Sequence, residues 1–163
     1  MGVDIATPEA GSTTGGLTRD ATLQNGQRFV LVEKESGKVL TVTAHQAVLQ
    51  DCDDMSMNAV HSMRHWHWDC IMTHGWMMLR NRVSENYLGP IYDPSIARLT
   101  VAPISAPTSG GFTGHLVVTG RGQTLSAPNG GYMFQIVRGK TPQTLAVGMT
   151  EGVEWEFIRV ESQ

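Results

Sequence analysis

The densest group of chemically reactive side chains lies between Asp51 and His74. An acidic loop that contains Asp53 comes first, and most of the histidines follow it. Four of the six histidines of the chain belong to this segment, namely His61, His65, His67 and His74. Because imidazole groups titrate close to neutral pH, such a cluster can perform general acid–base chemistry. If the protein is an enzyme of small-molecule metabolism using segment 61–74, the candidate catalytic residues are His65, His67 and Asp53.

The spacing of these histidines also permits a metal site. On a strand, alternate side chains share a face, so His65, His67 and Asp69 would lie opposite Trp66, Trp68 and Cys70. A zinc site needs three or four converging ligands, and the spacing establishes only His65 and His67, which are therefore weak candidates. We expect the tryptophan face in the core, with Cys70 buried and unreactive, and the histidine face toward solvent or the next repeat. We accordingly expect no resident metal or cofactor.

Aromatic and amide side chains form a second group in the middle of the chain. Aromatic rings can cover the apolar face of a sugar while carboxylates and amides bind its hydroxyls. The candidate ligand-binding residues are Trp76, Asn86, Tyr92 and Asp93. Tyr92 and Asp93 belong to a loop rich in proline and glycine, which favours exposure. For Trp76 and Tyr87, packing in the core is the stronger expectation.

Several classes of function lack their sequence signals. There is no nucleophile elbow, phosphate-binding loop or dinucleotide fingerprint. A net charge of −3 with scattered basic residues gives no indication of nucleic-acid or anionic-membrane binding. No apolar run approaches the length of a membrane span, and no secretory signal is visible, so a cytoplasmic location is expected. The cysteines, Cys52 and Cys70, are then expected as thiols, although a single bridge would be compatible with secretion.

The elements that must position these side chains are short strands in a recurring order. Three times a hairpin opens on apolar residues, turns on small polar ones and closes on a leucine, at Leu40, Leu88 and Leu145. Further short strands are expected at 46–50 and 98–101, and units end near 64–68, 114–118 and 153–157. About four strands per unit, dense glycine and little helical periodicity predict an all-β fold.

Three such units resemble a β-trefoil, specifically the ricin-B-type and fungal lectin branch. In that branch the repeats end on glutamine, a spacer and tryptophan; Arg64-His65-Trp66 and Val153-Glu154-Trp155 retain only the tryptophan, and 114–118 lacks it. The resemblance implies a single β-trefoil domain over residues 27–161, with three quasi-repeats and little helix, after a flexible tail at 1–26. Residues 1–26 are rich in small polar residues and poor in large apolar ones, which also favours a mobile tail.

The resemblance implies carbohydrate binding without catalysis. Sugar-binding members usually carry an aspartate near the second strand of a repeat, and the nearest residues here are Thr41, Gly89 and Ala146. The partner expected from the resemblance is a glycan or other small ligand. A protein-binding or protease-inhibitor trefoil remains an alternative, with variable loops at 51–62, 90–97 and 105–113 on a rigid barrel. The enzyme based on segment 61–74 is the other alternative.

Overall fold

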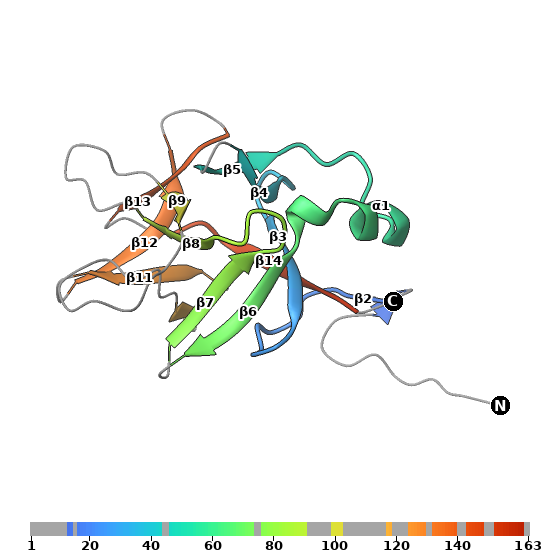
Figure 1. Ribbon diagram of the computed structural model, residues 1–163. Coiled ribbons are helices and arrows are strands. Elements are labelled where there is room, and N and C mark those ends of the chain that lie inside the picture. The colour runs from blue at the N-terminus through green and yellow to red at the C-terminus, as the bar shows by residue number, and fades with distance from the viewer. Residues whose placement is uncertain are drawn as a thin grey trace.

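The protein is built almost entirely from β-strands, as its computed structural model shows (Figure 1). The structure describes residues 13–14, 16–43, 46–73, 76–90, 99–102, 117–118, 124–129, 132–139, 143–148 and 152–161. The strands in these ranges are β1 (Thr13–Thr14), β2 (Leu17–Thr18), β3 (Arg28–Glu33), β4 (Val39–Thr43), β5 (Gln46–Gln50), β6 (Trp68–Thr73), β7 (Trp76–Asn81), β8 (Tyr87–Pro90), β9 (Leu99–Ala102), β10 (Val117–Val118), β11 (Leu125–Asn129), β12 (Tyr132–Arg138), β13 (Leu145–Gly148) and β14 (Trp155–Val160). The helical elements of the described part are the short helix α1 (Met57–Ser62) and the 3₁₀ turn η1 (Arg64–Trp66). The expected all-β class with little helix is confirmed. No helix of the described residues is long and apolar enough to cross a membrane.

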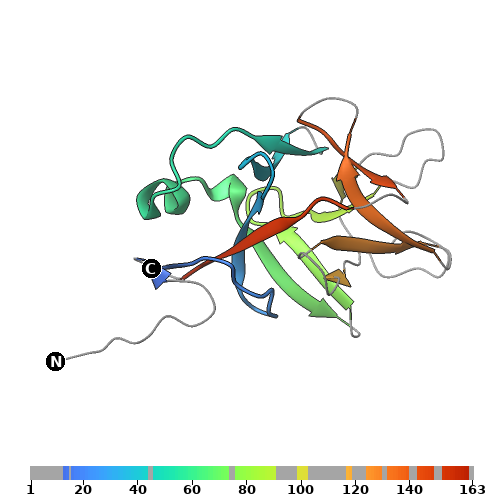
Figure 2. The same ribbon diagram turned by 180° about the vertical axis from the view of Figure 1, so that it is seen from behind.

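The described strands form two sheets. The larger has the order β1-β2-β14-β3-β4-β5-β9-β8-β7-β6, with an additional pairing of β3 with β6, and the smaller has the order β10-β11-β12-β13. β14, near the end of the chain, lies between β2 and β3, two strands from the beginning of the chain. Figure 2 shows these strands from behind. All of these pairings are antiparallel, as expected for hairpins joined by short turns.

The first two hairpins are constructed in the same way. In each, the first and last turn residues form the same backbone hydrogen bond, Glu33 N–H to Lys38 O and Asn81 N–H to Asn86 O, both at 2.9 Å. The second residue of each turn donates a backbone hydrogen bond to a neighbouring segment. Lys34 N–H binds Glu154 O at 3.0 Å, and Arg82 N–H binds His67 O at 2.9 Å. Glu33 and Glu154 in one hairpin therefore take the places of Asn81 and His67 in the other.

This equivalence corrects the expected ends of two units. Trp155 pairs with Glu33 across β14 and β3, and Trp68 pairs with Asn81 across β6 and β7. The counterpart of Trp155 is therefore Trp68 rather than Trp66. The expected strand at 64–68 is also wrong, because residues 64–66 form η1 and the strand begins at Trp68.

In the middle unit, the strand that precedes the next hairpin is β11 rather than residues 114–118. Of that expected range the structure describes only β10, and this strand pairs with β11. β11 pairs with β12 as β6 pairs with β7, and its Leu125 is fully buried. A leucine in β11 thus provides core volume in the unit that lacks a tryptophan.

A single large core joins the strands of both sheets. The tryptophans of β6 and β14 are fully buried in it together with the closing leucines of the three hairpins: Trp68, Trp155, Leu40, Leu88 and Leu145. Burial of such side chains stabilises the fold by roughly 1.5–3 kcal/mol each. The buried leucines and tryptophans therefore fix the ends of the hairpins to the core, and this holds the polar turns next to them in place.

A second, smaller core lies under the loop that contains α1. Val60 and Trp66 pack there with Val30 and Ile158 from the sheet. Ser56 caps α1 through a hydrogen bond from Ala59 N–H to its hydroxyl, at 3.3 Å. This packing fixes α1 and η1 against β3, and it positions the histidine segment.

The folded part begins ahead of residue 27, where the tail was expected to end. Leu17 in β2 is buried and its strand pairs with β14, while Ala21 and Leu23 belong to the large core. Arg19 forms an ion pair with Glu156 of β14 at 2.6 Å. The apolar residues of this stretch are few but well placed, so a composition rich in small polar residues did not indicate their packing. Residues 1–12 lie outside the described ranges.

Candidate functional site

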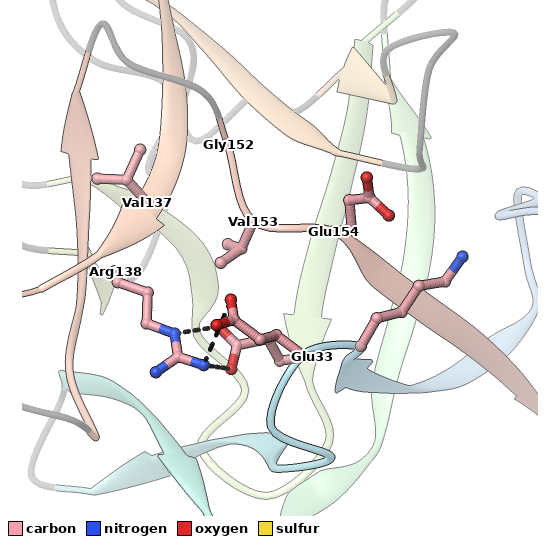
Figure 3. Close-up of a pocket in the computed structure, with 8 residues that line it drawn as sticks. Glu33, Val137, Arg138, Gly152, Val153 and Glu154 are labelled. Carbon is pink, nitrogen blue, oxygen red and sulfur yellow. Dashed lines mark hydrogen bonds and ion pairs between the residues drawn. The ribbon is translucent and has the colours of Figure 1, made fainter.

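A pocket of about 630 Å³ opens beside the turn of the first hairpin (Figure 3). Its walls come from three places in the chain: the turn at residues 33–35, the end of β12, and the segment that leads into β14. Val137 and Val153 provide apolar surface, and Gly152 leaves room next to them. These segments meet because β14 pairs with β3 and because Arg138 at the end of β12 reaches the turn.

The wall of this pocket is fixed by an ion pair. The carboxylate of Glu33 is fully buried and accepts two hydrogen bonds from the guanidinium of Arg138, with Nε to Oε2 at 2.7 Å. The hydroxyl of Ser36 donates a third hydrogen bond to the same carboxylate. Glu33 is therefore fully occupied within the protein, whereas the side chain of Arg138 keeps 36 % of its surface exposed. Bidentate pairing holds the guanidinium in one orientation.

Of the remaining charged groups of the pocket, Lys34 and Glu154 are left for a ligand, whereas Glu35 lies in an ion pair with Arg138 Nη2 at 4.0 Å. Lys34, Glu35 and Glu154 are exposed, and Figure 3 shows the Glu154 side chain directed away from the Glu33–Arg138 pair. Lysine donates hydrogen bonds, carboxylates accept them, and the valines offer apolar contact. Such a combination suits a small ligand with several hydroxyl groups. No aromatic side chain is among the described residues that line this pocket.

The histidine segment does not form the expected strand face. His67 is 1 % exposed and lies under α1, where its Nε2 is 2.7 Å from Val60 O. A carbonyl only accepts, so Nε2 carries the proton, and Nδ1 then accepts from Arg82 Nη1 at 3.2 Å. Burial lowers the pKa of His67 and favours the neutral ring. Of the two expected surroundings, solvent is wrong for His67, because η1 interrupts the two-residue period of a strand; the ring instead contacts Arg82 of the next hairpin.

The pairing of His65 with His67 as catalytic or metal-binding groups gains no support from this geometry. Both ring nitrogens of His67 are engaged, and the ring of His65 packs edge-on against Trp66 at 6.1 Å. Asp53 is exposed in its loop. Within the described ranges, no three histidine, cysteine or carboxylate side chains converge on a common point.

The cysteines are free thiols, and Cys70 lies in the core as expected. Burial raises the pKa of the Cys70 thiol to about 11. Since the thiolate is the nucleophile, Cys70 does not have the environment of a reactive cysteine.

The residues expected to bind a ligand in the second unit are described only in part. Tyr92 and Asp93 lie outside the described ranges. The backbone of Trp76 pairs with Thr73 at the start of β7, and its side chain is not among those that the structure describes. Asn86 is half-buried at the end of the second hairpin turn, and its backbone N–H binds Ser84 Oγ at 3.3 Å. Tyr87, expected in the core, is half-buried.

Three residues of the pocket in Figure 3 were not predicted from the sequence, namely Glu33, Arg138 and Glu154. They are far apart in the chain, and each alone is an ordinary charged residue. One signal was present: Glu33 and Arg138 each lie seven residues before a closing leucine, at the end of the opening strand of a hairpin. This correspondence places both residues at hairpin turns, but only the strand order shows that the two turns meet.

Several solved structures share this fold, among them a lectin and parts of two enzymes. No protein-family model and no curated protein matches the sequence itself. A ricin B-like lectin from Macrolepiota procera, in complex with lactose, matches 87 % of this chain and 100 % of its own, with a TM-score of 0.61 and 16 % identity. The chain has the fold of a ricin B-like lectin. The resemblance expected from the hairpins is thereby confirmed at the level of the fold.

Two further matches are parts of larger enzymes. A GlcNAcα1-4Gal-releasing endo-β-galactosidase from Clostridium perfringens has a TM-score of 0.62 at 13 % identity, over 83 % of this chain. A GH43 β-1,3-galactosidase has a TM-score of 0.56 at 14 % identity, over 90 % of this chain. The chain spans only 33 % and 30 % of the lengths of these enzymes, whereas it spans the whole lectin.

Proposed function

We propose that this protein is a carbohydrate-binding module of lectin type that performs no catalysis. The observation that carries the proposal is the match to a ricin B-like lectin over that protein's entire length, in a complex with lactose. An endo-β-galactosidase and a β-1,3-galactosidase also contain this fold, as about a third of their length. Galactosides are therefore the first ligands to test.

The pocket of Figure 3 is the first candidate position for the sugar. The exposed Glu154 accepts hydrogen bonds from neighbouring hydroxyls, Lys34 donates one, and the valines contact the apolar face of the ring. The turn is rigid because the Glu33–Arg138 pair fixes it, so little ordering entropy is lost on binding.

The second unit is the other candidate position, with Trp76, Asn86, Tyr92 and Asp93 as its ligand-binding residues. An aromatic ring there would cover the sugar, while Asp93 and the Asn86 amide would bind its hydroxyls. The two positions lie on different hairpins and do not share residues, so they can be tested separately.

Isothermal titration calorimetry with lactose and with galactose tests the proposal. Glu154→Ala with Lys34→Ala removes ligand contacts in the pocket of Figure 3, and Tyr92→Ala with Asp93→Ala removes them in the second unit. Lys34 and Glu154 are exposed, so their substitution leaves the core intact, and Val83→Ala, on an exposed turn, is the control. We expect one pair to weaken binding at least about tenfold, equivalent to roughly 1.4 kcal/mol.

The absence of sugar binding would refute the proposal. If neither lactose, galactose nor a glycan array gives saturable binding, the lectin function is refuted. Release of free galactose from lactose by the protein would instead refute the absence of catalysis. In that event the alternative of an enzyme would take its place.

A further inference from the structure

A second pocket, of about 470 Å³, lies on the part of the molecule that carries α1. Its lining comes from four distant places in the chain: the start of β3, the α1–η1 segment with His67, the turn after β7, and the end of β14. Figure 1 shows α1 and its connection to β6 beside β3. This pocket has no lining residue in common with the pocket of Figure 3.

Positive charge is concentrated in this pocket. Arg28, Arg64 and Arg82 line it together with His61 and His67, and Glu161 is its one lining carboxylate among the described residues. The protein as a whole carries a net charge of −3, so this concentration is contrary to its overall balance. Such a cluster on an acidic protein attracts anions locally.

The carboxylates nearby neutralise the cluster only in part, because Asp69 offsets the charge of Arg28. Asp69 accepts from Arg28 Nε at 2.8 Å, and Glu161 accepts from Arg159 Nε at 2.8 Å, so each is already paired. Within the described part of the chain, the guanidiniums of Arg64 and Arg82 have no carboxylate partner. Burial, and then the positive charges of Arg28 and Arg64, lower the pKa of Arg82.

The orientation of Arg82 is fixed in advance. His67 holds its proton on Nε2 for Val60 O, which leaves Nδ1 to accept from Arg82 Nη1. The backbone N–H of Arg82 also donates to His67 O at 2.9 Å. The buried histidine thus serves as a neutral acceptor that holds a guanidinium toward the pocket without cancelling its charge. A preorganised guanidinium loses little entropy when it binds an oxyanion.

We propose that this pocket binds the phosphate or sulfate ester group of a ligand, through Arg82 and Arg64 with Arg28 beside them. Guanidinium groups bind tetrahedral oxyanions through paired N–H donors, and two unpaired arginines in one pocket provide the donors that such a group requires. The inference is independent of sugar binding in the pocket of Figure 3, because the two pockets share no lining residue.

The test is a calorimetric titration of the full chain with inorganic phosphate and with inorganic sulfate at low ionic strength. Sodium chloride at the same ionic strength is the blank, since screening alone changes exposed charge interactions. We expect saturable binding of at least one oxyanion, weakened about fivefold or more by Arg64→Gln and by Arg82→Gln, since each removes a charge-assisted hydrogen bond.

Arg80→Gln is the matched control, because Arg80 is two residues away and pairs with the exposed Glu85 outside this pocket. It should change the affinity less than about twofold, as exposed ion pairs contribute little. Arg64 is exposed and unpaired in the described residues, so Arg64→Gln should fold normally, which circular dichroism and the melting temperature verify. No oxyanion binding beyond the chloride blank, or an equal loss in the Arg80 variant, overturns the proposal.

Galactose 6-phosphate and galactose 6-sulfate then distinguish the two sources of the oxyanion. Tighter binding of one ester, lost in the Arg82 variant, names its ester class as the ligand of this pocket. Equal binding of both esters supports recognition of the shared oxyanion. If galactose itself competes with phosphate for the pocket, recognition of an anion is refuted.

Discussion

Removal of Arg138 should destabilise the protein more than any other single change at the surface of the Figure 3 pocket. Arg138→Met leaves the fully buried carboxylate of Glu33 with only the Ser36 hydroxyl as a side-chain partner. Breaking a buried ion pair in this way costs about 3–5 kcal/mol. Because Arg138 is 36 % exposed, water can approach the carboxylate in the variant, and we expect about 2–3 kcal/mol. For a domain of this size, that corresponds to a fall in melting temperature of roughly 5–10 °C.

The double variant decides whether this reasoning is correct. Glu33→Met with Arg138→Met removes both charges, so it should be more stable than Arg138→Met alone, by about 1 kcal/mol or more. Urea unfolding followed by tryptophan fluorescence measures both, since Trp155 lies across from Glu33 in the sheet. Arg80→Met breaks the exposed ion pair of Arg80 with Glu85 and should cost less than about 0.5 kcal/mol. A cost below about 1 kcal/mol for Arg138→Met, or a double variant less stable than that single variant, would refute the buried-charge argument.

Three further predictions concern the hairpin turns, the tryptophans and His67. Gly37 and Glu85 hold equivalent turn positions at φ +75° and +61°. In urea unfolding, Gly37→Ala should lower the free energy of unfolding by about 1 kcal/mol, and Glu85→Gly should raise it by up to about 1 kcal/mol. A lower free energy of unfolding in Glu85→Gly would contradict backbone strain at Glu85. Trp68 Nε1 donates to Leu40 O at 3.2 Å, whereas buried Trp155 Nε1 has no partner among the described residues. Trp68→Phe should therefore cost about 1 kcal/mol more stability than Trp155→Phe in calorimetric melting, and equal costs would contradict a stabilising role of this hydrogen bond. Burial lowers the pKa of His67, so the unfolded chain binds the proton first as pH falls below about 6.5. Relative to His67→Gln, the native protein should therefore lose stability between about pH 7 and 5. Parallel curves of unfolding free energy against pH for the two proteins would disprove this.

The sequence predicted the elements that depend on local patterns and missed those that depend on distant contacts. The hairpin strands and the burial of Leu40 followed from apolar runs separated by polar turns. The burial of His67 did not follow, because it depends on α1, which packs over it through Val60. A six-residue helix has too few turns to show a clear apolar stripe.

The candidate sites were missed for a related physical reason. The first pocket depends on a contact between Glu33 and Arg138, 105 residues apart. The second depends on arginines from β3, η1 and the turn after β7, which are scattered singly in the sequence. Single charges show no pattern along the chain, so their convergence becomes visible only when the strand order is known.

The place of β14 has a consequence for how the chain reaches its folded state during synthesis. β2 and β3, near the beginning, are separated in the finished sheet by β14, which leaves the ribosome after every other described strand. Until residues 155–160 emerge, one edge of β3 lacks its partner along most of its length. Contacts of such long sequence separation slow folding, and exposed strand edges favour aggregation. The large sheet is therefore completed only at the end of synthesis, and a chain stalled before Trp155 should be a target for chaperones.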